Sequence, residues 1–165
     1  MVTLRKDILK YIIIPTIKET GLEKPGAAAI VHGTFMAETN YNALIQFKTP
    51  KNGGIGFGQC EPPTYLDHRI WLENGFSKDL LSNVLAACQL ASLPRDPMAL
   101  QWHLRLAVCI CRVDYYRAPG AIPTDAEGMS HYHKRYYNSM DGKADPLVNI
   151  AHFQKAIEEV HEITG

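Results

Sequence analysis

Apolar residues recur along the chain at the spacing of α-helices, and prolines, glycines and capping residues separate the periodic segments. The clearest case follows Asp145-Pro146, which combines an N-cap residue with a proline at the first helical position. The apolar positions after it keep to one helical face: Leu147, Ile150, Phe153, Ile157 and Val160. The pattern predicts helices over 27–38, 65–73, 78–93, 96–116, 124–137 and from 146 onward.

One predicted helix is apolar almost all round between 104 and 113, which is typical of a helix buried at the centre of a small domain. No alternating strand of useful length appears, although the loop 41–59 leaves room for a short β-hairpin with Asn52-Gly53 as its turn. The chain has 165 residues and no internal repeat or linker, so we predict a single domain over 1–165. The predicted fold class is all-α with a central buried helix, or α+β at most through that hairpin.

Charge and the length of the apolar runs exclude several classes of function. The 17 basic side chains equal the 17 acidic ones, so no net field attracts the chain to nucleic acid or anionic lipid. The apolar run 8–17 is interrupted by Lys10 and Pro15, is too short to span a bilayer, and is followed by no cleavage pattern. We therefore expect no nucleic-acid partner, no membrane insertion and no signal peptide. The four cysteines lack CxxC spacing and are expected to be reduced and buried.

The candidate chemistry centres on Glu38, which ends the predicted helix 27–38. Val31, Phe35 and Glu38 share one helical face, so the carboxyl group projects from the side that carries apolar residues. Partial burial and the negative end of the helix dipole both favour the protonated form of such a group. A protonated carboxyl group can donate its proton to a glycosidic oxygen. A solvated glutamate at a helix end has the same local pattern, so the position alone leaves both interpretations open.

A glycine-rich loop follows this helix, with glycines at 53, 54, 56 and 58. Without side chains, its backbone can approach a ligand or another segment closely. The spacing superficially resembles a phosphate-binding loop, but no predicted strand precedes it and no Lys-Ser/Thr follows it. Gln59, at the end of the loop, can both donate to and accept from sugar hydroxyl or N-acetyl groups. The loop therefore favours a glycan over a nucleotide.

Ordered blocks of sequence extend this pattern over nearly the whole chain. They are Ile14-Pro15-Thr16, Gly21-Leu22, Gly33-Thr34-x-x-Ala37-Glu38, the loop 54–64, Ile70-Trp71, Cys111 to Arg117, Ile122-Pro123 and the segment 132–139. In this order and spacing, the blocks resemble the lytic transglycosylase (SLT-type, lysozyme-like) domains encoded by bacteriophages.

The resemblance implies a lysozyme-like helical fold and cleavage of the β-1,4 bond between N-acetylmuramic acid and N-acetylglucosamine in bacterial peptidoglycan. It implies no cofactor and no metal. Glu38 occupies the position of the catalytic acid/base, and Gln59 belongs to the loop that shapes the glycan cleft. The residues expected to bind substrate are Thr39, Gly56, Phe57, Gln59, Glu61, Tyr115 and Tyr137.

The chain departs from the family pattern around this expected cleft. Thr39 stands where many relatives have a serine after the catalytic glutamate, and it keeps a hydroxyl group. Phe57-Gly58 stands where Leu-Met or a similar pair often precedes the glutamine. A Tyr-Asn-Ala-Gly motif, which supplies a tyrosine near the acid in many relatives, is missing from the sequence. Tyr115 is the candidate for that place, and Tyr136 or Tyr137 is expected in the cleft wall.

The number of catalytic acids separates two mechanisms. Hydrolysis uses two carboxyl groups flanking the bond, whereas a lytic transglycosylase can work with one. Glu61 and Asp67 are the candidate second acids. Glu61 precedes Pro62-Pro63, so its alternative role is to cap the next helix, and Asp67 is expected to be exposed. We favour Glu38 as the single acid/base, with a lysozyme-type hydrolysis assisted by Glu61 as the alternative.

A non-catalytic role is the competing hypothesis from another class: a phage tail or baseplate component that uses the fold for docking or glycan binding. The expected partners are accordingly peptidoglycan strands and, for a virion component, tail or baseplate proteins. The expected location is the virion or the host cytoplasm, with action on the periplasmic wall.

A metal site formed by His103, His131 and His133 is a further alternative. However, i and i+2 positions diverge on a helix, and no carboxylate stands at ligand spacing.

Overall fold

The computed structural model describes residues 3–45, 53–75, 77–138 and 142–165, and these are mostly helical. Within them, extended pairing is limited to two isolated bridges, Ile45 with Ile55 and Ile55 with Cys60. The all-α prediction is therefore confirmed. The predicted hairpin turn at Asn52-Gly53 lies partly outside the described residues, because Asn52 is not among them. No helix in the described ranges is long and apolar enough to span a membrane.

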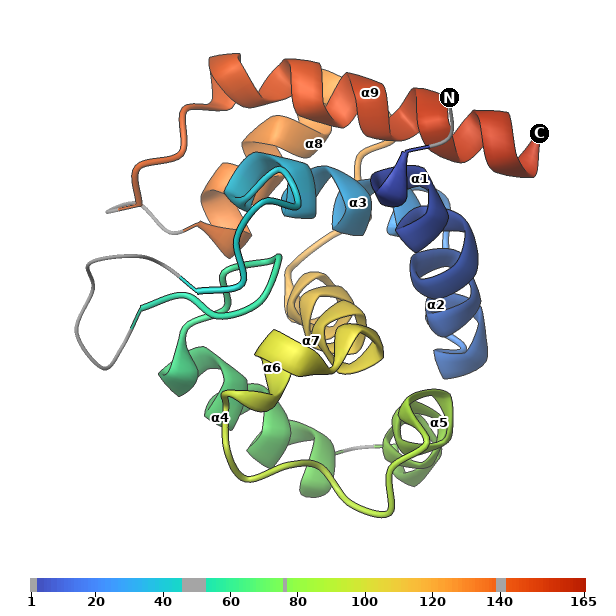
Figure 1. Cartoon of the computed structure of the whole chain (residues 1–165), viewed down its shortest axis with the longest axis vertical. Coiled ribbons are helices and arrows are strands. Elements are labelled where there is room, and N and C mark those ends of the chain that lie inside the picture. Colours follow the sequence, from blue (N-terminus) through green and yellow to red (C-terminus); the bar gives the residue numbers. More distant parts are fainter. Residues whose placement is uncertain (1–2, 46–52, 76, 139–141) are drawn as a thin grey trace.

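The helices follow one another in the order shown in Figure 1. They are α1 (Leu4–Ile8), the π-helical η1 (Leu9–Ile13), α2 (Ile14–Thr20), α3 (Ala27–Glu38), α4 (Pro62–Glu73), α5 (Lys78–Cys88), α6 (Ala99–Trp102), α7 (Leu104–Arg117), α8 (Ala126–Tyr132), the π-helical η2 (His133–Tyr137) and α9 (Pro146–Thr164). The bounds predicted for the helix 27–38 are confirmed.

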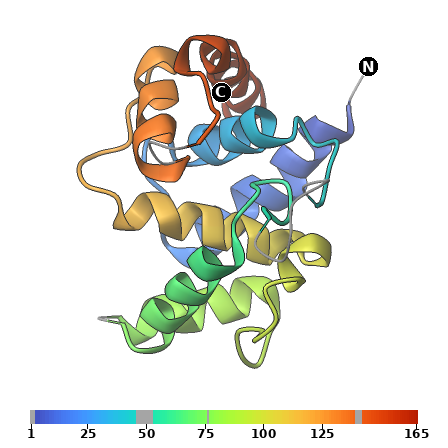
Figure 2. The ribbon, with the colours of Figure 1, turned by 90° about the vertical axis from the view of Figure 1, so that its left-hand side faces the viewer.

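Helix α7 crosses the middle of the molecule, with α3, α8 and α9 on one side and α4 and α5 on the other (Figures 1 and 2). The segment from Leu106 to Val113 is buried, which confirms the predicted central helix. This arrangement brings the end of α3, the start of α4 and the middle of α7 around one cavity. The candidate site therefore lies beside α7, between α3 on one side and α4 on the other.

Three predicted helix boundaries were wrong for local reasons. The helix predicted over 96–116 is broken at His103, whose side-chain Nδ1 accepts from the Leu106 amide and caps α7. The helix predicted over 78–93 ends at Cys88, because Gln89 adopts a left-handed conformation with φ of 55°. Helix α4 begins at Pro62 rather than 65, because a proline fits the first helical turn.

The helix predicted from the capping box at 124–127 begins at Ala126. Asp125, not Thr124, is its N-cap residue, and the Asp125 carboxylate accepts from the Gly128 amide. The last turn before Asn138 is the π-helical η2 instead of a continuation of α8. A π-helical turn shifts the phase of the side chains that follow, and such turns are frequent at functional sites.

Helix α9 packs directly on α3 through a glycine. A Cβ atom placed on Gly33 would lie 2.4 Å from Cδ1 of Phe153, closer than any side chain tolerates. Gly33 therefore lets the Phe153 ring lie against the α3 backbone, and that ring is completely buried. The contact fixes the distance between α3 and α9 at the middle of α3.

A buried polar network joins both ends of the chain to α3. The carboxylate of Glu159, on α9, accepts from the Arg5 guanidinium at 2.6 Å and lies 2.7 Å from Nε2 of His32. Nδ1 of His32 is hydrogen-bonded to the Tyr41 hydroxyl. Glu159 is only 1% exposed, and a buried carboxylate without partners would be strongly destabilising. The network therefore ties α1, α3, α9 and the turn after α3 together.

Acid is expected to weaken the folded state through this network. Burial lowers the pKa of His32 from its ordinary value of 6.5, so below that pH the unfolded chain binds a proton that the folded chain does not. Burial alone would raise the pKa of Glu159, but hydrogen bonds from Arg5 and His32 outweigh it and hold the pKa below 4.5. The free energy of unfolding in urea should therefore fall from about pH 7 downward, and fall further below about pH 4.5.

Two variants separate this network from the other titrating groups. His32→Gln keeps a donor and an acceptor but does not titrate, so its stability should depend less on pH between about pH 7 and about pH 5 than that of the wild type. His161→Gln changes an exposed histidine on α9 and should keep the wild-type dependence. The same pH dependence in all three proteins would contradict the prediction.

Candidate functional site

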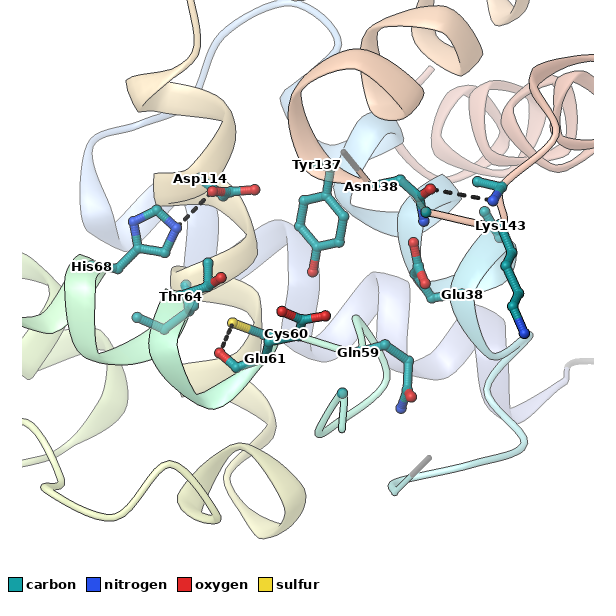
Figure 3. A pocket seen from close by; sticks show the side chains of 15 residues that line it. Glu38, Gln59, Cys60, Glu61, Thr64, His68, Asp114, Tyr137, Asn138 and Lys143 are labelled. Atoms are coloured by element: carbon teal, nitrogen blue, oxygen red, sulfur yellow. Dashed lines mark hydrogen bonds and ion pairs between the residues drawn. The ribbon is translucent and has the colours of Figure 1, made fainter. Parts of the chain in front are cut away.

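A cavity of about 610 Å³ opens where α3, α4, α7 and η2 meet (Figure 3). This is the size range of small-molecule sites. A second hollow of about 500 Å³ shares Thr64, His68 and Asp114 with the cavity and continues it along α4 and α7. Together the two hollows extend from Glu38 along α4 and α7, which gives room for a ligand longer than a single sugar.

Glu38, the last residue of α3, has its carboxyl group at this cavity (Figure 3). The side chain is 16% exposed, and its Oε1 lies 2.9 Å from Nε2 of His133. Asn40 and Tyr41 then turn the chain away with positive φ angles of 47° and 61°, an uncommon conformation for residues other than glycine. The bond from Tyr41 to His32 holds that turn. Glu38 is thus presented from a fixed helix end.

His133 lies behind Glu38 and is 1% exposed. Its ring stacks on Tyr137, with centroids 5.5 Å apart at 21°, and lies against Phe153 on α9. Among the residues that the structure describes, Nδ1 of His133 has no hydrogen-bond partner. The sequence pattern singled out this histidine only as a metal ligand, so its contact with Glu38 was missed. Helical spacing cannot reveal a contact between residues so far apart in the chain.

The glycine loop is anchored to η2 and to the end of α3. The Tyr137 hydroxyl donates to the Gly58 carbonyl at 2.6 Å, and a Cβ atom on Gly58 would lie 2.7 Å from that hydroxyl. Burial raises the pKa of Tyr137 well above its usual value, so the group stays a donor. From the other side, the Thr39 hydroxyl donates to the Phe57 carbonyl at 2.9 Å. The absence of a side chain at 58 is therefore explained by the docking of Tyr137.

Four of the predicted site residues line the cavity: Glu38, Gln59, Glu61 and Tyr137. The Gln59 side-chain amide donates to the Gly56 carbonyl at 2.9 Å, which leaves its own carbonyl oxygen for a ligand. Thr39, Gly56 and Phe57 are not among the lining residues. They hold the loop through backbone bonds and through the packing of Phe57 on Phe35 and Tyr41.

Tyr115 is a correction to the predicted site. It is buried in α7, its hydroxyl shares a 2.6 Å hydrogen bond with Thr34, and its ring stacks on Tyr132 and Tyr137. It therefore cannot supply a tyrosine to the cavity. Helical phase explains the result, because position 115 continues the inward face of the central helix.

The capping role expected of Glu61 is also corrected. Glu61 occupies the N-cap position of α4, but its side chain makes no capping hydrogen bond. The carboxyl group is exposed and lines the cavity instead. Asp67 is exposed, as predicted, and pairs with Arg117 at 2.7 Å. Of these two candidate second acids, only Glu61 lines the same cavity as Glu38.

Asp114 is a further carboxyl group of the cavity that the sequence did not indicate. Its Oδ1 lies 2.6 Å from Nε2 of His68 (Figure 3). Arg117 donates to Nδ1 of the same ring at 2.9 Å. A guanidinium group can only donate, so the ring proton must be on Nε2 and points at Asp114. The signal that the sequence offered was an aspartate directly after the apolar segment 104–113.

The cysteines and histidines offer no other reactive centre. All four cysteines are free, and Cys88, Cys109 and Cys111 are buried as predicted, whereas Cys60 is only partly covered and lines the cavity. Burial raises the pKa of the Cys60 thiol well above its usual value, which disfavours a thiolate nucleophile. The described ranges hold no group of three His, Cys, Asp or Glu side chains arranged for a metal ion.

No protein-family model, curated protein or solved structure matches the chain. The chemistry of the cavity is therefore inferred from its own residues. These supply two carboxyl groups that are each bonded to a histidine, one further carboxyl group, and amide and hydroxyl groups. Such a set suits acid catalysis on a polar, uncharged ligand such as a glycan.

Substitution of Gly58 is expected to disturb the wall of the cavity. Gly58→Ala places a methyl group 2.7 Å from the Tyr137 hydroxyl, so the bond to the Gly58 carbonyl must break or the loop must shift. We expect a loss of about 1–3 kcal/mol in the free energy of unfolding, measured by urea denaturation.

The double variant Gly58→Ala with Tyr137→Phe provides the control, because the phenyl ring lacks the clashing oxygen. Its loss of stability should be smaller than the sum of the two single losses. Additive losses would show that the methyl group and the hydroxyl do not meet.

Proposed function

We propose that the protein cleaves the β-1,4 bond between N-acetylmuramic acid and N-acetylglucosamine of bacterial peptidoglycan, as a lytic transglycosylase of phage origin. The observation that supports the proposal most directly is the Glu38 carboxyl group. It ends α3 at a cavity lined by further polar groups, is 16% exposed and is held by His133. The sequence resemblance indicates the substrate, and the presence of an acid and of polar groups in one cavity supports the reaction.

In this mechanism Glu38 acts alone as acid and then as base. Its protonated carboxyl group gives a proton to the glycosidic oxygen as the bond to the muramic acid anomeric carbon breaks. The resulting carboxylate then takes the proton of the 6-hydroxyl group of the same sugar, and that oxygen bonds to the anomeric carbon. The product is a 1,6-anhydro sugar, no water is consumed, and Glu38 is again protonated.

The other polar groups of the cavity are assigned to binding. The Gln59 carbonyl oxygen can accept from an N-acetyl or hydroxyl group, and Thr64 on α4 can donate to and accept from hydroxyl groups. The continuation of the cleft past His68 and Asp114 gives room for further sugars. The tyrosines contribute rigidity here, since the Tyr137 hydroxyl is already bonded to Gly58.

Hydrolysis is the alternative reaction, because the cavity holds further carboxyl groups. Glu61 is exposed at the start of α4, and Asp114, on α7, is held by His68 of α4. Either one could activate a water molecule if it lies on the opposite side of the scissile bond from Glu38. A non-catalytic virion component that binds glycans is the alternative from another class. It is favoured by the burial of Tyr115, which leaves the position of the missing tyrosine motif unfilled.

Removal of the acid tests the proposal. Glu38→Gln keeps the shape of the side chain but cannot donate a proton to the leaving oxygen, so release of soluble muropeptides from purified sacculi should fall by about 10²–10⁴-fold. Glu127→Gln, which changes an exposed glutamate on α8, should retain wild-type activity. Wild-type protein that binds sacculi but releases no product would favour the structural alternative, and equal activity of Glu38→Gln would refute the role of Glu38.

The mass of the products separates the two mechanisms. A 1,6-anhydro end is lighter by one water than the hydrolytic end. For the single-acid mechanism we expect anhydro products, and losses below about 10²-fold in Glu61→Gln and Asp114→Asn, the threshold being the usual minimum for a missing acid or base. Hydrolytic products together with a larger loss in one of these variants would identify that residue as the second acid.

A further inference from the structure

The described residues contain three buried histidines that each bring Nε2 to a carboxyl group. His32 lies 2.7 Å from Glu159, His68 lies 2.6 Å from Asp114, and His133 lies 2.9 Å from Glu38. In the first two pairs the opposite nitrogen, Nδ1, is also occupied, by the Tyr41 hydroxyl and the Arg117 guanidinium respectively. The pair at Glu38 differs, because Nδ1 of His133 has no partner in the described part of the chain.

This difference determines where the proton of His133 resides. The ring is 1% exposed and is covered by Tyr137 and Phe153, so no bulk water reaches it. A proton on Nδ1 would be a buried donor without an acceptor, which folded proteins avoid more strictly than an unused lone pair. A proton on Nε2, in contrast, points at Oε1 of Glu38. The neutral ring with its proton on Nε2 is therefore the favoured form.

We propose, on the basis of the proposed function, that His133 is the positioning residue of the reaction. It donates from Nε2 to Oε1 of Glu38 and thereby keeps the catalytic proton on Oε2, the oxygen that remains for the substrate. Since His133 lies behind Glu38 and is buried, it does not touch the glycan and carries no proton to it. Its effect is exerted through Glu38.

The bond is compatible with both states of Glu38 in the cycle. When Glu38 is protonated on Oε2, Oε1 is a carbonyl-type acceptor for the Nε2 proton. When Glu38 has given up the proton, Oε1 is a carboxylate oxygen and the same bond becomes charge-assisted and stronger. The carboxyl group therefore need not rotate between donating one proton and taking the next. A fixed acid of this kind is the geometric requirement for efficient proton transfer.

The surroundings of His133 are rigid enough for this role. It begins the π-helical turn η2, and Tyr137 closes that turn by stacking on the His133 ring. The Tyr137 hydroxyl in turn holds the loop at Gly58, next to Gln59, which lines the cavity. The π-helical turn thus fixes the acid and the substrate-binding loop relative to each other.

Three variants test the role in activity. His133→Leu removes the donor and should lower kcat on purified sacculi by about 10–10²-fold, with KM changed by less than about threefold, because binding groups are untouched. His133→Gln retains an amide donor at the end of its side chain and should recover most of that loss. The matched control, His131→Leu, changes an exposed histidine of the adjoining helix and should behave as wild type. A loss in His133→Gln as large as in His133→Leu would overturn the proposal, as would a similar loss in the control.

The position of the proton is measured independently of activity. Long-range ¹H–¹⁵N correlation spectra of the ¹⁵N-labelled wild type should show His133 with a protonated Nε2 and a bare Nδ1. Glu38→Leu, which removes the acceptor, should shift the His133 signals more than those of His32 and His68. A proton on Nδ1, alone or with one on Nε2, would overturn the inference even in a fully active protein. An inactive wild type that shows the Nε2 proton would refute the proposed function while leaving the hydrogen bond established.

Discussion

The rest of the structure depends on the bonds that the buried carboxylate of Glu159 makes to Arg5 and His32. It is 1% exposed and needs both the Arg5 guanidinium and the His32 ring to offset the loss of hydration. Those partners come from α1 and α3, while Glu159 itself is on α9. The helix that ends in Glu38 is therefore held at its middle by polar bonds and, at Gly33, by the Phe153 ring. The position of the candidate acid follows from these two contacts.

The same pair, a histidine whose Nε2 is hydrogen-bonded to a carboxyl group, occurs in the buried network around Glu159 and at the cavity. At Glu159 the histidine is satisfied on both nitrogens, and the pair serves stability. At Asp114, Arg117 fixes His68 from behind, and the carboxyl group faces the cleft. At Glu38 one ring nitrogen lacks a described partner, which is the kind of local cost that proteins retain at functional sites. The pair at Glu38 thus differs from the pair at Glu159 in the second ring nitrogen of its histidine, which has no partner among the described residues.

Local sequence patterns predicted the fold well where the determinants are local. Helix α3 has the predicted bounds, the central helix is buried, and Asp145 caps α9 as expected. The errors arose where a side chain overrides periodicity, as His103 does by capping α7. At the site, Glu38 and Gln59 were found because they lie beside an unusual loop. His133, His68 and Asp114 were missed because their pairing depends on tertiary contacts. Tyr115 was misplaced because the family resemblance assigned it to the cleft, although its helical phase turns it toward the core.

The contact between α3 and α9 has a consequence for the order in which the parts of the chain fold during synthesis. Glu159 and His32 are 127 positions apart in the chain, and Glu159 and Arg5 are 154 apart. Phe153, which covers both Gly33 and the His133 ring, also belongs to this late segment. During synthesis, α3 and η2 leave the ribosome before α9 does, so neither can be clamped in place at that stage. We therefore expect the pairing of the acid with its histidine to be completed late in folding, and a chain cut before α9 to carry Glu38 without the Phe153 ring that covers His133.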